Sequence, residues 1–215
     1  MRTQPEYMSP AGIEAGSFAI IDGELAERGI VLTGDTGPVI RRCIHTTADF
    51  SYARTLKFSE GAVEKLKELI RRGAFVVTDT EMARSGISKK EFARYGGRLL
   101  CFMADGDVAD KAKERGVTRA SVSMEKAAGL AGPVIFAVGN APTALMTLKR
   151  MYDEGRYTPA FVIGVPVGFV NVEEAKESVL EMPVPYIVNA GRKGGSTVAA
   201  AVMNAVLYEM RDERS

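Results

Sequence analysis

The stretch RRCIHTTADF, residues 41 to 50, contains His45, the single histidine of a 215-residue chain. Histidine changes its charge near neutral pH, so His45 is the first candidate for a proton donor or acceptor. Cys43 lies two positions away, and residues two apart on a helix project in different directions, which argues against a Cys–His nucleophilic pair. Cys43 falls on an apolar stripe and is interpreted as a core residue. His45 falls off that stripe near a helix end, where the helix dipole favours its protonated form. Position alone leaves it either catalytic or exposed and inert.

A second candidate is the glycine-rich segment NAGRKGGST, residues 189 to 197, in which Arg192 and Lys193 stand directly before a predicted helix. Backbone N–H groups and the dipole at a helix start favour an anion, so a carboxylate or phosphate could be held there. The segment lacks the G-x-x-x-x-G-K-[ST] spacing of a phosphate loop. The alternative is a glycine-rich turn that carries two solvated cations.

The elements that would position these residues follow from five short apolar runs. From residue 74 onward the runs alternate with helical patterns, a rhythm that predicts βαβ units and a parallel sheet. Their apolar residues are consecutive, as expected for strands buried on both faces. Ligands of such sheets bind beyond the carboxyl ends of the strands, where polar loops follow each run. The runs are AFVVT (74–78), LLCFMA (99–104), VIFAVG (134–139), AFVIGV (160–165) and YIVNA (186–190).

Residues 1–73 have helical periodicity instead, in two apolar stripes and a third segment, SEGAVEKLKELIRRG. We therefore predict one α/β domain over residues 1–215, with a helical part (1–73) followed by βα units (74–215). Its sheet should be doubly wound and mainly parallel, with helices on both faces. The stripes are Ile13, Ser17, Ile20, Ile21 and Leu25, and Val39, Ile40, Cys43, Ile44 and Thr47. Expected helix caps are Ser59, Ser88, Asp107, Asn140 and Asn171, and expected stops are Gly73, Gly96, Gly116 and Gly155.

Charge and composition exclude several classes of protein. Lys plus Arg number 28 against 27 Asp plus Glu, so the net charge of +1 provides no global attraction for nucleic acid or an anionic membrane. Two cysteines without CxxC spacing indicate neither a zinc site nor a disulfide framework. The N-terminus lacks the apolar region of a signal peptide, and no run of about 18 apolar residues could span a bilayer, so we expect a cytoplasmic protein. A nucleotide-dependent enzyme is disfavoured because no strand precedes G-x-G-x-x-G.

Five separate motifs occur in one order along the chain. Through these motifs the sequence resembles the precorrin-8 methylmutases, also called precorrin isomerases, of cobalamin biosynthesis. The resemblance extends from about Ile13 to Leu207. The resemblance implies an α/β fold and an intramolecular methyl shift from C11 to C12, converting precorrin-8x to hydrogenobyrinate or its cobalt form to cobyrinate. The motifs are IHTTADFSYA (44–53), TDTEMARSGI (78–87), GNAPTAL (139–145), GVPVGFVNVEEAKE (164–177) and GRKGGSTVAAAVMNAVL (191–207).

The resemblance also implies roles for particular residues. His45 matches the family's catalytic histidine and would protonate or hydrogen-bond the macrocycle. The substrate carries several carboxylates around an apolar disc, so its pocket should have basic and hydroxyl groups at the rim. No cofactor or protein-bound metal is implied, since any cobalt is held by the macrocycle, and a homodimer with its site near the interface is expected. The alternative is a corrinoid carrier without catalysis. Candidate substrate-binding residues are Ser17, Thr46, Thr47, Thr80, Arg84, Arg119, Arg192 and Lys193.

Overall fold

Five of the six strands found within residues 9–214, the part of the chain that the computed structural model describes, form at the apolar runs expected from the sequence. The expectation about a signal peptide falls partly on residues 1–8, outside that part. The strands are β1 (Leu56–Phe58), β2 (Phe75–Thr78), β3 (Arg98–Leu100), β4 (Val134–Val138), β5 (Phe161–Gly164) and β6 (Tyr186–Asn189).

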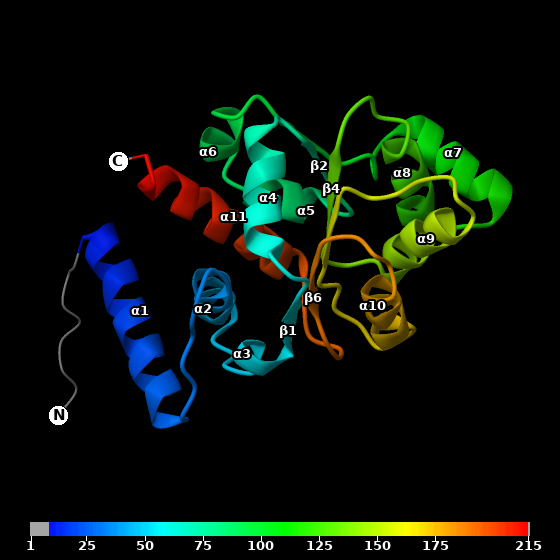
Figure 1. Cartoon of the computed structure of the whole chain (residues 1–215). Helices are drawn as coiled ribbons and strands as arrows, with labels where there is room; N and C mark the ends of the chain where they lie inside the picture. Colours follow the sequence, from blue (N-terminus) through cyan, green and yellow to red (C-terminus); the bar gives the residue numbers. More distant parts are fainter. Residues whose placement is uncertain (1–8, 215) are drawn as a thin grey trace.

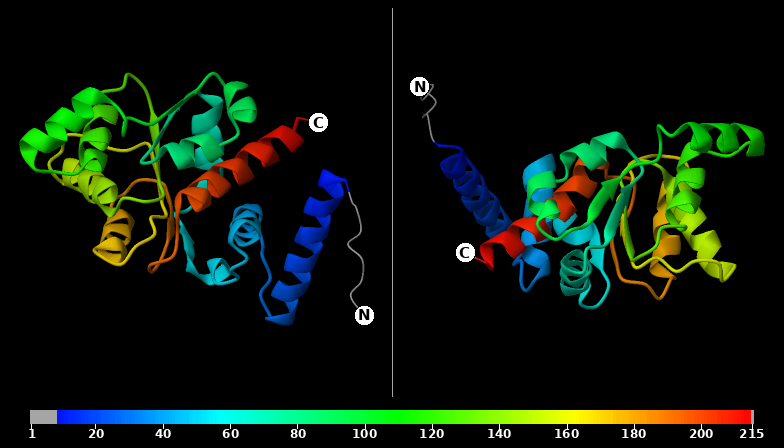
Figure 2. Two further views of the ribbon diagram at one scale, coloured as in Figure 1. Left: turned by 180° about the vertical axis from the view of Figure 1, so that it is seen from behind. Right: turned by 90° about the horizontal axis from the view of Figure 1, so that it is seen from above.

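Helices cover both faces of the sheet, as predicted (Figures 1 and 2). On one face lie α2, α4, α5, α6 and α11, and on the other lie α7, α8, α9 and α10. The helices are α1 (Pro10–Glu27), α2 (Thr36–Thr47), α3 (Tyr52–Thr55), α4 (Ala62–Arg71), α5 (Glu81–Gly86), α6 (Lys89–Ala93), α7 (Gly106–Arg115), α8 (Arg119–Ala127), α9 (Pro142–Asp153), α10 (Val172–Leu180) and α11 (Ser196–Asp212). None of these helices is long and apolar enough to cross a membrane, a finding limited to residues 9–214.

The strand order β1-β6-β5-β4-β2-β3 confirms a doubly wound, mainly parallel sheet. β1 pairs antiparallel with β6, and the other neighbours pair parallel. Consecutive strand residues are buried on opposite faces, since Val76 belongs to the core under α11 and Val77 to the core under α8 and α9. The direction of winding reverses between β2 and β4, which makes the gap between their carboxyl ends the topological switch point.

The prediction that residues 1–73 contain no strand is wrong at β1. This strand pairs with the outer edge of β6, and its three residues form a strand because β6 provides their hydrogen-bonding partners. Three residues are too few to produce a readable period of two. The prediction of a fully buried run at 99–104 is also wrong, because β3 is an edge strand that ends at Leu100 and is only partly buried.

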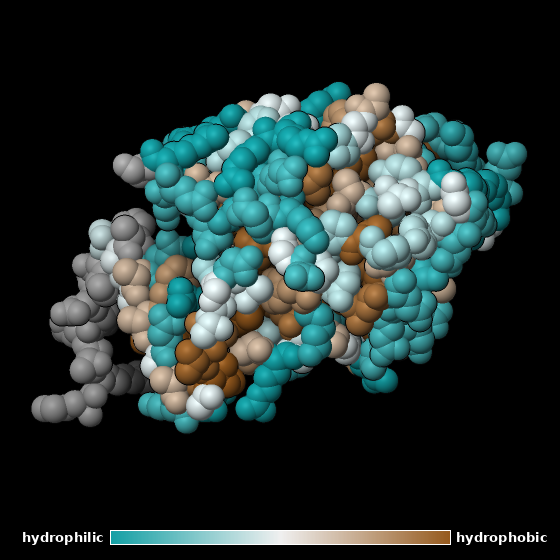
Figure 3. Space-filling view, in the orientation of Figure 1, coloured by the Kyte–Doolittle hydropathy of each residue, from teal (hydrophilic) through white to brown (hydrophobic). Residues whose placement is uncertain are grey.

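The first apolar stripe was predicted one residue away from the face that packs. α1 stands at the outside of the molecule and packs chiefly on α2 (Figures 1 and 2). Ile21 and Leu25 are buried, but Ile13 is 55% and Ile20 65% exposed. The face of the molecule drawn in Figure 3 is mostly hydrophilic, with apolar side chains in separate groups.

Helix ends were predicted with mixed success. Ser88 caps α6 through its hydroxyl, and Asn171 caps α10 through a left-handed backbone. Three starts were misplaced by one or two residues, since the caps of α4, α7 and α9 are Gly61, Asp105 and Ala141 rather than Ser59, Asp107 and Asn140. The four predicted stops all have positive φ, as helix-terminating glycines do; they are Gly73, Gly96, Gly116 and Gly155.

Candidate functional site

His45 lies in the last turn of α2 with its side chain exposed. The inward stripe of α2 packs on α11 and on the core, which leaves His45 and Thr46 facing outward. The helix ends because Ala48 adopts φ 54° and its N–H bonds the carbonyl of Ile44 at 2.7 Å. Cys43 belongs to the core, and burial raises the pKa of its thiol to about 12, so the thiol stays protonated. The interpretation of Cys43 as a core residue is confirmed.

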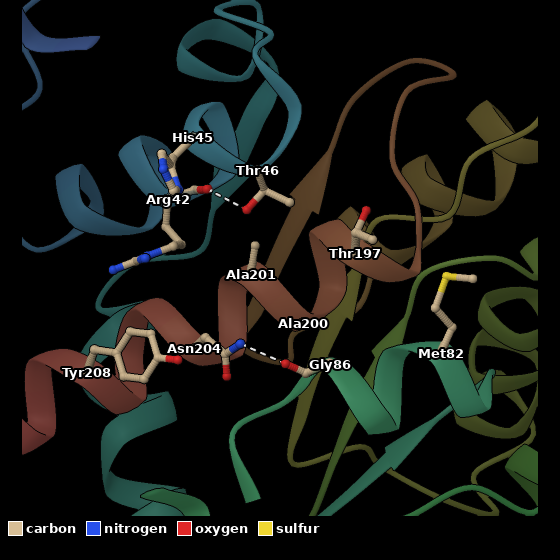
Figure 4. A pocket seen from close by; sticks show the side chains of 10 residues that line it. All are labelled: Arg42, His45, Thr46, Met82, Gly86, Thr197, Ala200, Ala201, Asn204 and Tyr208. Atoms are coloured by element: carbon tan, nitrogen blue, oxygen red, sulfur yellow. Dashed lines mark hydrogen bonds between the residues drawn. The ribbon is translucent and has the colours of Figure 1, made fainter. Parts of the chain in front are cut away.

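His45 lines a cavity of about 340 Å³ between α2, α5 and α11 (Figure 4). The cavity combines an apolar floor of alanine, glycine and methionine with cationic, hydroxyl, amide and phenol groups around it. This composition suits a largely apolar ligand with polar groups at its edge. The residues are Arg42, His45 and Thr46 of α2, Met82 and Gly86 of α5, and Thr197, Ala200, Ala201, Asn204 and Tyr208 of α11.

The floor exists because α5 and α11 approach closely. A Cβ added to Gly86 would lie 2.9 Å from the Cβ of Ala200, so a larger residue at either position would separate the helices. Asn204 fixes the contact, since its amide nitrogen donates to the carbonyl of Gly86 and its oxygen accepts from the N–H of Ser88, both at 2.8 Å. Asn204 is therefore a wall of the cavity with its polar atoms already satisfied.

Arg42 lies one helical turn before His45 and reaches toward Tyr208 across the cavity (Figure 4). Its guanidinium lies 4.9 Å from the ring centroid of Phe18 and 5.1 Å from that of Tyr208. Glu14 of α1 accepts a hydrogen bond from its Nη1. Phe18 also contacts His45, with ring centroids 5.2 Å apart. Phe18 of α1 thus contacts both Arg42 and His45 of α2.

Three further predicted residues, at α5 and α1, do not line this cavity. Thr80 caps α5 by accepting from the N–H of Ala83, and its hydroxyl shares a 2.7 Å hydrogen bond with Ser196. Arg84 forms an ion pair with Glu81 on the same helix. Ser17 lies beside Phe18 on α1 and donates to the carbonyl of Ile13 at 2.8 Å, which explains a serine on that helix face.

The hydroxyls of Thr46 and Thr47 are both engaged by their own helix. Thr46 lines the cavity while donating to the carbonyl of Arg42 at 2.9 Å. Thr47 donates to the carbonyl of Cys43 at 2.8 Å and accepts from the N–H of Asp49 at 3.2 Å, so it stabilises the helix end. Of the two, only Thr46 faces the cavity beside His45.

The cations of the glycine-rich segment are held by carboxylates outside this cavity. Lys193 donates to Asp49 at 2.6 Å and to Ser51 at 3.1 Å, and its hydrogen bond lowers the pKa of Asp49 to about 2. Arg192 pairs with Glu173 at 2.7 Å. Both cations remain 60% exposed, and neither lines the cavity beside His45. Lys193 ties the glycine-rich segment to the chain just after α2.

Arg119 lies on the opposite face of the sheet. It is the first residue of α8, exposed, and lines a separate cavity of about 490 Å³ together with residues of α7. α8 packs on α7 and α9, whereas α2 packs chiefly on α11. Within one chain, Arg119 does not join His45.

The switch point of the sheet is closed by a buried carboxylate, Asp79, that sequence reasoning did not single out. Its two oxygens accept hydrogen bonds from the backbone N–H groups of Gly139, Asn140 and Ala141 at 2.8, 2.7 and 2.6 Å. These donors at the start of α9 are the ones that would face an anionic ligand in a doubly wound sheet. Asp79 takes that place, and it also explains why the Asn140 side chain is not needed as a cap.

Lys176 is a second buried charged residue that the sequence did not reveal. Its ammonium donates to the carbonyls of Gly191 and Lys193 at 2.6 and 2.8 Å, which holds the glycine-rich segment against α10. Burial lowers its pKa from 10.5 to about 8. A lysine at the fifth position of a surface helix gives no signal of this role, because its partners are backbone atoms.

We predict that stability rises with pH between about 8 and 10 more steeply in the wild type than in Lys176→Met. In this window the unfolded chain, with its lysine pKa near 10.5, holds a proton that the folded protein, with a pKa of about 8, has released. The buried charge of Lys176 lowers the free energy of unfolding at pH values below about 8, and about 1–3 kcal/mol of that loss is recovered as the pH rises. Urea unfolding of both proteins at about pH 7.5 and about pH 9.5 tests this.

The comparison with Lys176→Met is needed because Cys43 acts in the opposite direction. Burial raises its pKa from 9.0 to about 12, so it removes stability as pH rises above about 9 in both proteins. Subtracting the two curves cancels this contribution. Parallel pH dependences of the two proteins would show that Lys176 is not the titrating group.

Within residues 9–214, no three His, Cys, Asp or Glu side chains converge as metal ligands. Apart from Thr46, the residues that line the cavity around His45 were missed by sequence reasoning, although two signals pointed to some of them. Arg42 precedes His45 by three positions, which places both on one side of a helix. Thr197, Asn204 and Tyr208 are spaced by seven and four along an alanine-rich helix, which makes one polar-edged face.

Comparisons with known proteins agree over nearly the whole chain. Residues 12–209 match the family described as precorrin-8X methylmutase (CbiC). The cobalt-precorrin-8 methylmutase of Priestia megaterium is 42% identical over 94% of this chain and 89% of its own length. The precorrin-8X methylmutase of Pseudomonas aeruginosa is 36% identical over 90% of this chain and 92% of its own length. A crystal structure of precorrin-8x methyl mutase from Thermus thermophilus superposes with a TM-score of 0.83 at 38% identity, covering 94% of this chain and 98% of the other.

Proposed function

The chain belongs to the precorrin-8X methylmutase family, and from that premise we propose that it moves a methyl group from C11 to C12 of precorrin-8x or cobalt-precorrin-8. As a member of this family it is an isomerase of cobalamin biosynthesis. The products would be hydrogenobyrinate and cobyrinate. The observation that carries the proposal is the position of His45 at the rim of a cavity with an apolar floor and a cationic and hydroxyl edge.

The chemistry requires little from the protein. The methyl carbon breaks its bond to C11 and forms one to C12, and any proton that the ring accepts during the migration is given back, so the macrocycle gains and loses no atom overall and no external nucleophile is consumed. What the reaction needs is a change in the electron distribution of the conjugated ring at the moment of migration. A proton or hydrogen bond donated by His45 to the ring supplies that change, and a positioned acid of this kind contributes about 10²- to 10⁴-fold.

The cavity of one chain covers only part of such a substrate. Ligand pockets range from about 300 to about 1,000 Å³, and this cavity, at about 340 Å³, lies at the small end, whereas a macrocycle with its carboxylate side chains is a large ligand. Arg119 and Arg192, two of the predicted carboxylate-binding residues, do not line it. Both facts favour a homodimer in which the partner completes the site, and Ile13 and Ile20 on the outer face of α1 are suited to the contact.

We predict a particle near twice the 23.2 kDa of one chain in sedimentation velocity. Ile20→Glu should weaken the dimer because it places a charge in an apolar contact, and Leu180→Glu on the distant helix α10 is the control. A monomeric wild type would overturn the dimer proposal. Dissociation of the Leu180 variant instead of the Ile20 variant would assign the interface elsewhere.

The experiment that tests the function has a binding step and a turnover step. Purified protein is mixed with hydrogenobyrinate and separately with cobyrinate, desalted, and its visible spectrum recorded; we expect retained colour. It is then supplied with precorrin-8x, and conversion is followed by absorbance. Retained colour without conversion would favour a corrinoid carrier, and neither colour nor conversion would refute the proposal.

A further inference from the structure

We propose that Arg42 binds a carboxylate of the macrocycle, and that Glu14 of α1 occupies this position until the substrate replaces it. The proposal rests on the proposed function, because the substrate's peripheral carboxylates are the groups that Arg42 would meet. It adds to the site a carboxylate-binding residue, Arg42 of α2, and an internal competitor, Glu14 of α1. The two helices lie side by side, with α1 on the outer side of α2 (Figure 1).

Arg42 is built into the wall of the cavity. Its side chain is only 17% exposed, and its guanidinium lies between the rings of Phe18 and Tyr208, 4.9 and 5.1 Å from their centroids. Contacts with aromatic rings restrain the guanidinium and leave N–H groups at its edge for hydrogen bonds. A guanidinium in this state needs no further ordering to receive a carboxylate in a two-pronged hydrogen bond.

Glu14 shows that a carboxylate can bond the guanidinium of Arg42. It bonds Nη1 of Arg42 from α1, and its own side chain is 46% exposed. A carboxylate so open to water loses little when it returns to solvent, since an ion pair with an exposed partner contributes little. A substrate carboxylate that arrives with the binding energy of a whole macrocycle can therefore displace it.

The position relative to His45 gives the contact a function. Arg42 and His45 are one turn apart on α2 and line the same cavity, and Phe18 of α1 contacts both side chains. A carboxylate bound to Arg42 would fix which edge of the macrocycle faces His45. Arg42 is therefore a specificity-determining residue: it orients the ring so that the acid meets the reacting edge.

The neighbouring residue supplies a matched control on the same two helices. Arg41 pairs with Asp22 of α1 at 2.8 Å, but neither residue lines the His45 cavity. Arg41→Gln removes the same charge from α2 as Arg42→Gln, and Asp22→Asn removes the same charge from α1 as Glu14→Gln. A change in net charge or a loosened α1 would alter binding in the Arg41 and Asp22 variants as well as in the Arg42 and Glu14 variants. Loss of a carboxylate-binding residue would alter binding only in the Arg42 and Glu14 variants.

The dissociation constant of hydrogenobyrinate is measured by absorbance titration for the wild type and the four variants, each checked for cooperative thermal unfolding. We expect Arg42→Gln to bind about 10- to 100-fold more weakly, from the loss of charge-assisted hydrogen bonds. Glu14→Gln should bind about 2- to 5-fold more tightly, because the competitor is weakened. Arg41→Gln and Asp22→Asn should stay within about 2-fold of the wild type. Arg42→Lys, which keeps the charge and loses the fork, should lie between Arg42→Gln and the wild type.

The second readout uses hydrogenobyrinate in which all the carboxylates are converted to methyl esters. With its carboxylates neutralised, the ester should bind wild type and Arg42→Gln equally, a result that a merely structural role of Arg42 would not give. Equal binding of the free acid by Arg42→Gln and wild type would overturn the proposal that Arg42 binds a substrate carboxylate. A loss of affinity in Arg41→Gln as large as that in Arg42→Gln would overturn it too. Weaker binding by Glu14→Gln than by the wild type would overturn the proposal that Glu14 competes with the substrate carboxylate. Failure of the wild type to bind any corrinoid would instead refute the proposed function.

Discussion

His45→Ala should lower the turnover of precorrin-8x by about 10²- to 10⁴-fold, the contribution of a positioned acid. Its affinity for hydrogenobyrinate should remain within a few-fold of the wild type, because the walls contributed by α5 and α11 are unchanged. Stability should also be retained, since His45 is exposed and carries no packing of the core. Single-turnover absorbance with enzyme in excess measures the rate, and a titration with product measures the affinity.

The control for this variant is Thr46→Ala, which truncates the next residue at the same cavity. The hydroxyl of Thr46 is already bonded to the carbonyl of Arg42, so its removal should change the rate far less than the removal of His45. Wild-type turnover by His45→Ala would reject the acid mechanism while leaving the isomerase assignment intact. A joint loss of binding and turnover would show that His45 holds the substrate rather than acting on it.

Local patterns carried the prediction of the helix that presents His45. Val39, Ile40, Cys43 and Ile44 are buried at the spacing expected of one helix face, and this alone places His45 outside the core. The inner parallel strands were equally readable, because a parallel strand covered on both faces needs an uninterrupted apolar run, whereas β1 and β3 at the edges of the sheet were missed or misjudged. The same reasoning failed at α1, where the face that packs is defined by a partner helix. Ile13 and Ile20 are as apolar as Ile21, yet of the three only Ile21 is buried.

The contacts that assemble the site could not be predicted, because they join residues that are distant in sequence. Glu14 meets Arg42 across 28 positions, and Asp79 meets Gly139 across 60. Spacing along the chain carries no information about such pairs. The family resemblance selected His45 and Thr46, which line the cavity, but it also selected Arg119, which one chain places on the other face of the sheet. A resemblance transfers residue identities, and the packing of this chain decides which of them meet.

Asp79→Asn should lower the free energy of unfolding by about 2–4 kcal/mol. Burial raises the pKa of Asp79, against the opposing effect of three backbone N–H donors, so the carboxylate is costly to bury and those hydrogen bonds offset the cost. An asparagine keeps the shape but turns one oxygen into an NH₂ group, which faces N–H donors and can accept from none of them. At least one buried N–H is then left without an acceptor.

The consequence of Asp79→Asn should reach beyond stability, because the carboxylate joins the end of β2 to the start of α9 at the switch point of the sheet. Urea unfolding at neutral pH measures the loss, with Asp105→Asn as the control. Asp105 also stands at a helix start, but it pairs with Lys126 at the surface and should contribute less than about 1 kcal/mol. If Asp79→Asn were no less stable than Asp105→Asn, the three N–H groups would have other acceptors. The closed switch point would then depend on the packing of α9 rather than on one buried charge.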